Sequence, residues 1–256
     1  MSTAALHRIR VSTGLVARDL VRNRVAAVML LVIPTVLYLL IWLTMGERSV
    51  PFQLSGLGEQ VLTAGERDLS MLFMGMTAIS GLSAFVAFVL VLRPIAADRR
   101  LTFEGYRPGE LLLAKVLVML AATLLVALYV SVLLPLFFRP QRPGGVFGAF
   151  LLTALVYGAL GMAVGAVVRQ ELEGILVILL LVNVDAGWLQ NPVFYGHAHN
   201  QEVIRALPAH YPGQVAMLSA FTDAGVAPEI TTALGYAGAV LLLAAALYWR
   251  RVRVRR

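Results

Sequence analysis

The sequence predicts an all-α, polytopic membrane protein with six membrane-spanning helices. Of its 256 residues, 59% are hydrophobic and only 14% are charged, whereas about a quarter of the residues of a soluble domain are charged. Six apolar runs are each long enough to cross a hydrocarbon layer roughly 30 Å thick, and charges or Pro/Gly turns bound each of them. The runs cover residues 25–45, 69–92, 111–138, 146–168, 172–189 and 230–249 of a single transmembrane domain, 1–256.

The arginines predict the orientation of the chain. Most of the 21 Lys and Arg residues fall in segment 1–24, in the connection 93–110 or after Trp249. Because positive charges resist translocation, these segments and both termini are expected in the cytoplasm of a cell-membrane protein. Only the turn with Arg139 and Arg142 runs against this bias. The net charge of +7 lies next to the apolar runs, so anionic membrane lipid, and not nucleic acid, is the expected counter-charge.

Segment 1–24 is expected to form an amphipathic helix in the membrane interface. Its apolar residues recur at helical spacing, with arginines on the other side. The alternative is a disordered basic leader, because the Ser-Thr-Gly stretch from Ser12 weakens the helical propensity. The apolar positions are Leu6, Ile9, Val16 and Leu20.

Nucleotide binding is not expected in this chain. A P-loop needs a lysine between Gly and Ser or Thr, but Lys115 is the only lysine and stands between Ala114 and Val116. Zero cysteines exclude disulfides, thiolate metal sites and cysteine nucleophiles. The chain is therefore not expected to be an enzyme or to hold a cofactor, and any ATP and Mg must be bound elsewhere.

Three histidines invite a metal interpretation. Imidazoles two residues apart can share one ion, and a nearby carboxylate such as Glu202 could complete its shell. Loop histidines are usually solvated, however, and no helical HExxH pattern supports a metal here. We therefore expect no metal site. The histidines are His197, His199 and His210.

The fourth apolar run carries a stripe of small residues. Gly158, Gly161 and Gly165 recur three or four residues apart, a spacing that lets helix backbones approach closely in lipid. This stripe predicts a helix-packing face. It leaves open whether the partner helix belongs to the same subunit or to a second one.

The connection 93–110 carries a family resemblance. Asp98-Arg99, Thr102, Pro108, Glu110 and Lys115 follow one another in an order that resembles the first cytoplasmic loop of permease subunits of the ABC type-2 exporter family. In that family the loop forms a short coupling helix that docks on the ATPase subunit. The resemblance implies the same role here for Arg99, Arg100, Glu104, Tyr106, Arg107 and Glu110.

A weaker similarity follows the fifth run. Gly187 and Pro192, and then Leu207-Pro208, are similar to the family's pattern at the exit of this helix, while Asp185 and the histidine-rich stretch depart from it. The departures leave the substrate type open. Segment 190–229 is expected outside the cell. Within it, Gln214 to Phe221 is too short to span the membrane and is expected to be re-entrant, to lie on the surface or to pack as a loop on the bundle.

Asp185 has two interpretations. A carboxylate inside an apolar run is costly and usually faces a cavity, a partner or a pathway, so Asp185 could line the outer end of an export path with Asn183 and Trp188. The other interpretation is an interfacial aspartate that reaches headgroups or water, and its nearness to Pro192 favours this one slightly.

The resemblance extends over essentially the whole chain and implies a permease subunit of an ATP-driven exporter. Such a subunit would pair with a second copy or a paralogue, would be driven by separate ATPase subunits, and would export an amphiphilic or lipid-like substrate such as a drug, antibiotic, lipid or glycan. Two alternatives are an integral membrane enzyme and an ion-coupled secondary transporter. The enzyme lacks paired intramembrane carboxylates or helical His ligands, and the transporter would usually show inverted repeats or several intramembrane ionisable groups.

Overall fold

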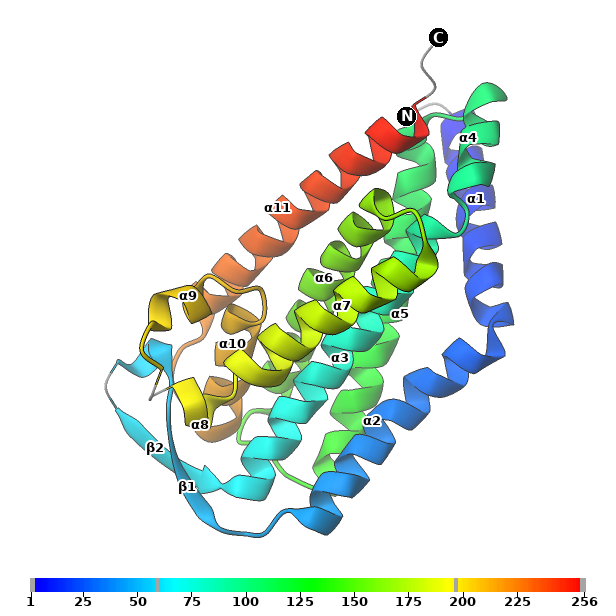
Figure 1. Cartoon of the computed structure of the whole chain (residues 1–256). Helices are drawn as coiled ribbons and strands as arrows, with labels where there is room; N and C mark the ends of the chain where they lie inside the picture. The colour runs from blue at the N-terminus through cyan, green and yellow to red at the C-terminus, as the bar shows by residue number, and fades with distance from the viewer. Residues whose placement is uncertain (1–2, 59, 196–197, 254–256) are drawn as a thin grey trace.

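Six long helices form one bundle in the computed structural model, which describes residues 3–58, 60–195 and 198–253 (Figure 1). Each is long and apolar enough to cross a membrane, which confirms the predicted all-α polytopic fold class. The sixth apolar run extends further than predicted, and the fifth continues into a π-helical turn, η3 (Asp185–Leu189). The helices are α2 (Arg24–Thr44), α3 (Glu66–Leu92), α5 (Pro108–Leu133), α6 (Pro143–Val167), α7 (Glu171–Val184) and α11 (Ala227–Val252).

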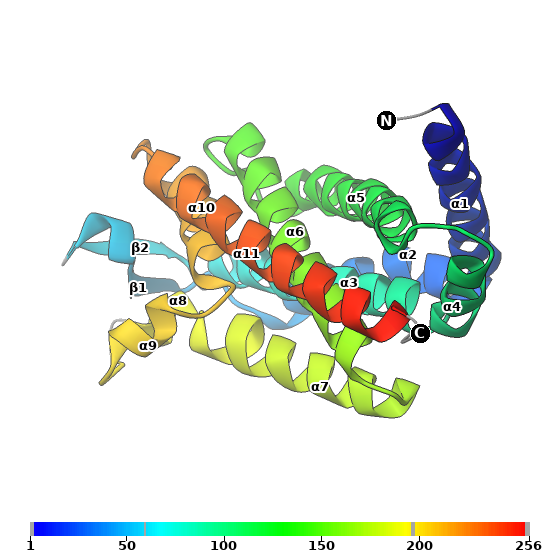
Figure 2. The same ribbon diagram turned by 90° about the horizontal axis from the view of Figure 1, so that it is seen from above.

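Helix α6 lies at the centre of the bundle, with α3, α5 and α11 packed around it (Figures 1 and 2). Its glycines make this possible. A side chain at Gly161 would meet the backbone of Ala84 in α3, and the Cβ of a residue at Gly165 would lie 2.8 Å from the carbonyl oxygen of Phe88. Gly158 faces Met119 of α5. The predicted small-residue face therefore packs within the chain, against α3 and α5.

The arginine-rich end of the bundle carries two further helices. Helix α1 (Thr3–Arg22) is set at an angle to α2, and α4 (Ile95–Phe103) lies near it, at the end where α11 also terminates (Figure 1). Helix α1 packs on α5, with Ile9 buried. Segment 1–24 is thus helical from Thr3 to Arg22, and not a disordered leader.

The opposite end of the bundle, called here the hairpin end, contains a β-hairpin that the sequence analysis did not predict. Strands β1 (Ser49–Gln53) and β2 (Val61–Gly65) pair antiparallel, with Ser49 opposite Gly65. Val50 and Phe52 point inward and are buried, as alternate residues of a half-buried strand do. The hairpin thereby covers this end of the helical core.

Segment 190–229 folds onto the hairpin end as three short helices. They are α8 (Pro192–Tyr195), α9 (Gln201–Arg205) and α10 (His210–Phe221). Helix α10 is largely buried and packs on α6, so this stretch is a helix inserted in the bundle and not a surface-lying one.

Arg142, an exception to the charge bias, has a structural function at the hairpin end. Its Nη2 donates hydrogen bonds to the carbonyl oxygens of Leu218 (3.0 Å) and Ala224 (2.7 Å). These carbonyls lie in the last turn of α10 and just beyond it. The arginine at this position therefore ties the start of α6 to the end of α10.

The close approach of α3 and α6 predicts the effect of one added methyl group. Gly161→Ala should destabilise the protein by about 1–3 kcal/mol, because the methyl group meets backbone that cannot move aside cheaply. Gly148→Ala is the matched control on the same helix, since nothing lies within 4 Å of its added Cβ. Thermal unfolding in detergent measures both variants. Equal melting temperatures for Gly161→Ala and Gly148→Ala would contradict the packing described here.

Candidate coupling site

Helix α4 is fixed to the bundle by a buried polar cluster. The carboxylate of Asp98, on the inner side of α4, lies 3.1 Å from the Lys115 ammonium of α5 and accepts a hydrogen bond of 2.9 Å from the Tyr248 hydroxyl of α11. Lys115 also donates to the carbonyl oxygen of Leu90 in α3 (3.0 Å). One cluster therefore joins α4 to three membrane-spanning helices.

The three side chains of this cluster are buried, which makes the loss of any charged partner costly. Asp98 is 4% exposed, and Lys115 and Tyr248 are each 1% exposed. Burying two charges costs several kcal/mol per ion, which their attraction and additional hydrogen bonds offset only in good geometry. A pair of this kind adds little net stability, but removing one partner is expensive. Its main effect is to restrict α4 to one position on the bundle.

The outer face of α4 and of the turn after it is exposed and mixed in character. Phe103, at the end of α4, is 72% exposed. Exposure of a large apolar side chain to water is unfavourable. Charged side chains surround it in the sequence, and all of them are exposed. They are Arg99, Arg100, Glu104 and Arg107.

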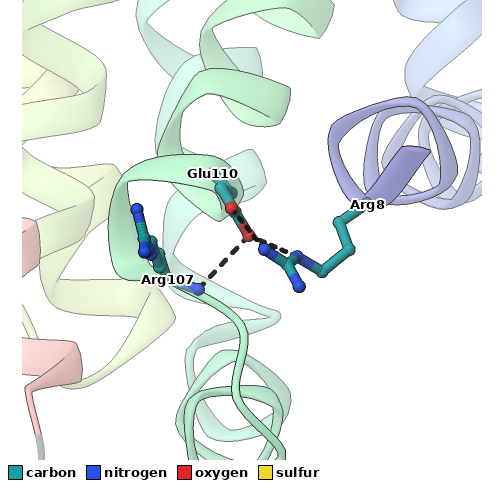
Figure 3. Close-up of polar contacts among 3 residues, drawn as sticks. All are labelled: Arg8, Arg107 and Glu110. Carbon is teal, nitrogen blue, oxygen red and sulfur yellow. Dashed lines mark hydrogen bonds and ion pairs between the residues drawn. The ribbon is translucent and has the colours of Figure 1, made fainter. Parts of the chain in front are cut away.

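Glu110 faces α1 and not the outer surface (Figure 3). The Arg8 guanidinium donates to both carboxylate oxygens of Glu110, at 2.8 and 2.9 Å, the bidentate geometry that makes such pairs strong. The same carboxylate accepts the Arg107 backbone N–H at 3.4 Å and so closes the first turn of α5. Arg8 also lies 5.9 Å from the centre of the Tyr106 ring. These contacts join α1 to the start of α5.

A groove of about 580 Å³ runs between α2 and α7, with α3 as its floor. Its lining is mainly apolar, with a few polar side chains that include Thr77 and Asn183. At the arginine-rich end, Arg93 lines the groove and forms an ion pair of 2.6 Å with Glu171 at the start of α7. The groove is therefore an amphiphilic surface open on one side of the subunit.

Of the three predicted path residues, the structure brings only Asn183 to this groove. Asp185 is 5% exposed and lies inside the chain, so it neither lines the groove nor reaches headgroups or water. The difference arises because two residues of helix turn a side chain by about 200°, so that the Asp185 carboxylate lies on the opposite face from Asn183 and meets Tyr157 of α6. Trp188 is 62% exposed, at the hairpin end of the span, and amphipathic aromatic rings are common at the ends of membrane spans.

Asp185 instead joins the elements of the hairpin end. Its carboxylate accepts hydrogen bonds from the Tyr157 hydroxyl (2.5 Å), the Ala209 backbone N–H (3.0 Å) and the Gln190 amide (3.1 Å). The Gln190 side chain in turn lies 3.1 Å from Nδ1 of His210. Tyr157 comes from α6 and Ala209 immediately precedes α10, so the carboxylate holds α6, η3 and α10 together.

Both ring nitrogens of His210 have hydrogen-bond partners in this network. The Gln190 amide nitrogen donates to Asp185 and to the Ile204 carbonyl oxygen. The Gln190 amide oxygen therefore faces His210 and accepts a hydrogen bond from its Nδ1–H. The other ring nitrogen then accepts from the Ser55 hydroxyl at 2.9 Å. His199 is exposed, and His197 lies outside the described residues. Among the described residues, no group of three or more His, Cys, Asp or Glu could hold a metal ion.

Some partners in the Asp98 cluster and in the contact between α1 and α5 could not be identified from sequence. Tyr248 is 150 positions from Asp98 and Arg8 is 102 positions from Glu110, so no local pattern joins either pair. The family pattern includes Asp98 and Lys115, but it does not indicate that they form an ion pair. Phe103 had a usable signal, because it is a single aromatic residue within a charged helix.

The buried ion pair predicts an asymmetric response to substitution. Lys115→Met should destabilise the protein by about 3–5 kcal/mol, because it leaves the Asp98 carboxylate buried without a counter-charge. The double variant Asp98→Asn/Lys115→Met should recover much of that loss. Thermal unfolding of both variants in detergent provides the measurement, and a double variant no more stable than Lys115→Met would show that charge pairing is not what matters at this position.

His210 predicts how stability depends on pH. Burial, and secondarily the charge of Arg205, lowers the pKa of His210 from 6.5 to about 4. The unfolded chain therefore binds more protons than the folded chain between these values, so this contribution to stability is complete above pH 6.5 and is lost as the pH falls toward 4. His210→Gln should reduce this dependence, while His199→Gln, at an exposed position, should not. Melting temperatures from pH 7 to 4 test this, and identical slopes in the two variants would contradict it.

Comparison with known proteins agrees with this architecture. Residues 12–184 match the family model described as ABC-2 type transporter. A search of the curated proteins finds no match. The matched segment begins in α1 and ends with α7, so it contains α4, the ion pair beneath it and the helices of the groove. The match covers well over half of the chain, and the protein therefore belongs to the ABC-2 type transporter family as a membrane-embedded permease.

Proposed function

We propose that the chain is the membrane subunit of an exporter that pairs with a second permease subunit, a copy or a paralogue, and with two separate ATPase subunits. The ATPase subunits would bind ATP and Mg, and the permease would catalyse no reaction. The arginine-rich end would face the cytoplasm of a cell membrane, as the charge bias favours. The substrate would be amphiphilic or lipid-like, as a drug, antibiotic, lipid or glycan precursor is.

The observation that carries this proposal is the two-sided character of α4. Its inner side is fixed through Asp98, while its outer side exposes Phe103 among charges. An exposed aromatic side chain with exposed arginines and a carboxylate as sequence neighbours is typical of a protein interface, in which aromatic and arginine residues provide much of the binding energy. An ATPase subunit is the partner that a permease without a nucleotide-binding motif requires.

Motion of the ATPase subunits would enter the bundle through the same helix. A displacement of α4 cannot leave Asp98 behind without burying an unpaired charge, so α5 and α11 must follow through Lys115 and Tyr248. The bond between Arg8 and Glu110 would carry α1 along with α5. Rigid elements tied in this way are suited to shear and hinge motions.

We assign Glu110 to this internal link, although the family resemblance implied a direct contact with the ATPase. Its carboxylate already accepts three hydrogen bonds, two of them from Arg8, and Glu110 is only 8% exposed. Arg99, Arg100, Glu104 and Arg107 remain as candidates for the contact, with Phe103 added to them.

The groove between α2 and α7 would form half of the export path. Both helices are largely exposed in the single chain, and a second permease subunit against this side would enclose the groove. Its apolar lining would accept the apolar part of a substrate, while polar side chains such as Asn183 would face the head of the molecule. Asp185 would act indirectly, by holding the turn that carries the outer end of α7.

A mild-detergent pull-down of the tagged chain, analysed by mass spectrometry and an ATPase assay, tests this function. Wild-type protein should recover a P-loop ATPase. Phe103→Asp, Glu104→Arg and Arg107→Glu should each reduce its recovery at least roughly tenfold, as expected for side chains central to an interface. Val61→Asp is the control, because Val61 is a similarly exposed apolar residue (57%) at the hairpin end.

Two results would contradict the proposal. Intact wild-type protein that never recovers an ATPase would favour a secondary transporter or a membrane enzyme. Equal loss of the ATPase in Val61→Asp and Phe103→Asp would show that recovery depends on general stability and not on α4.

A further inference from the structure

A second feature of the arginine-rich end is a hollow bordered by four arginines. It measures about 570 Å³ and lies between α4, the turn after α6 and the last turn of α11. These elements are far apart in the sequence, and the fold alone gathers their charges. The arginines are Arg99, Arg169, Arg250 and Arg251.

Within the described part of the chain, no carboxylate neutralises these charges. Among the residues that the structure describes, no carboxylate lies within 4.0 Å of any of the four guanidinium groups. The acidic residues nearest in sequence are already used, since Glu171 pairs with Arg93 and Asp98 with Lys115. Four like charges held together cost energy through mutual repulsion, which an anion in the hollow would relieve.

Two of the guanidinium groups are held in place. Arg251 donates through Nη1 to the carbonyl oxygens of Gly165 (2.8 Å) and Val168 (2.5 Å) at the end of α6. Arg99 donates through Nε to the carbonyl oxygen of Arg251 at 3.0 Å. Each guanidinium has five N–H donors, so most of the donors remain available to a ligand. The hollow is therefore partly organised before anything binds.

The remaining lining is apolar and indicates what kind of anion fits. Ala166, Val167 and Leu247 complete the wall, and Val167 is 62% exposed. All three lie in the last turns of the membrane-spanning helices α6 and α11. A ligand in this place meets arginines on one side and aliphatic surface on the other, as an amphiphile does at the boundary between headgroups and acyl chains.

We propose that this hollow binds the phosphate headgroup of an anionic membrane lipid. Planar guanidinium groups bind phosphate oxygens through paired hydrogen bonds, and basic pockets between membrane helices suit anionic headgroups. A lipid bound there would touch α4, α6 and α11 at once. Lipid composition would then influence how firmly α4 is held, independently of the ATPase.

Native mass spectrometry of the purified full-length chain, titrated with phosphatidylglycerol, phosphatidylcholine or inorganic phosphate, tests the proposal. Phosphatidylglycerol should bind more tightly than phosphatidylcholine. Arg169→Gln and Arg250→Gln should each weaken phosphatidylglycerol binding about fivefold, which corresponds to about 1 kcal/mol per arginine. These two residues are chosen because the hydrogen bonds that orient the hollow come from Arg99 and Arg251, so the fold should survive.

Arg100→Gln is the matched control, because Arg100 is exposed at the same end on α4 but does not line the hollow. If Arg100→Gln weakened phosphatidylglycerol binding as much as Arg169→Gln and Arg250→Gln do, the lipid would be held by a general attraction to the arginine-rich end. That result would overturn the proposal. Displacement of the lipid by millimolar inorganic phosphate would overturn the lipid as the source of the phosphate. Unchanged binding in Arg169→Gln and Arg250→Gln would exclude the hollow.

Discussion

The ion pair between Asp98 and Lys115 is the constraint on which the arginine-rich end depends. Because both groups are buried, α4 cannot rotate or slide without exposing one charge to an apolar environment. That single position of α4 determines which side chains face outward, with Phe103 among them. It also brings α11 into the same unit, since the Tyr248 hydroxyl completes the shell of the Asp98 carboxylate. Helix α4 and the membrane helices α5 and α11 are thereby one mechanical element.

The hairpin end is held by a different kind of contact, and the middle of the bundle by a third. Around Asp185 the links are hydrogen bonds to side chains and backbone of α6, η3 and α10. Between the two ends, α3 and α6 meet at Gly161 and Gly165 with no room for a side chain. In contrast, α2, α7 and α11 are much less buried. A rigid α3–α6 centre with looser outer helices is the arrangement that lets outer helices move against a fixed core.

The sequence predicted the features that depend on neighbouring residues. Span lengths follow from runs of apolar residues and the helix-packing face from the spacing of Gly158, Gly161 and Gly165, while the position of α4 follows from the family resemblance of the connection 93–110. It did not predict contacts between distant segments, such as Tyr248 with Asp98, because those depend on how helices pack. The hairpin was missed for another reason. Val50 and Phe52 alternate as in a strand, but two short strands within a polar loop give only a weak pattern.

The junction of α7 and the π-helical turn η3 links the groove to the buried Asp185 network. Asn183 faces the groove, and two residues later the Asp185 carboxylate is fixed inside the chain by Tyr157 and Ala209. Two residues of helix turn a side chain by about 200°, so the two side chains point to opposite faces, and the π-helical turn η3 begins at the second of them. Because Asn183 and Asp185 belong to one turn of backbone, the groove cannot shift at the hairpin end while the Asp185 network is intact. Movement of α7 at the hairpin end requires either a hinge within η3 or the displacement of α10 along with it.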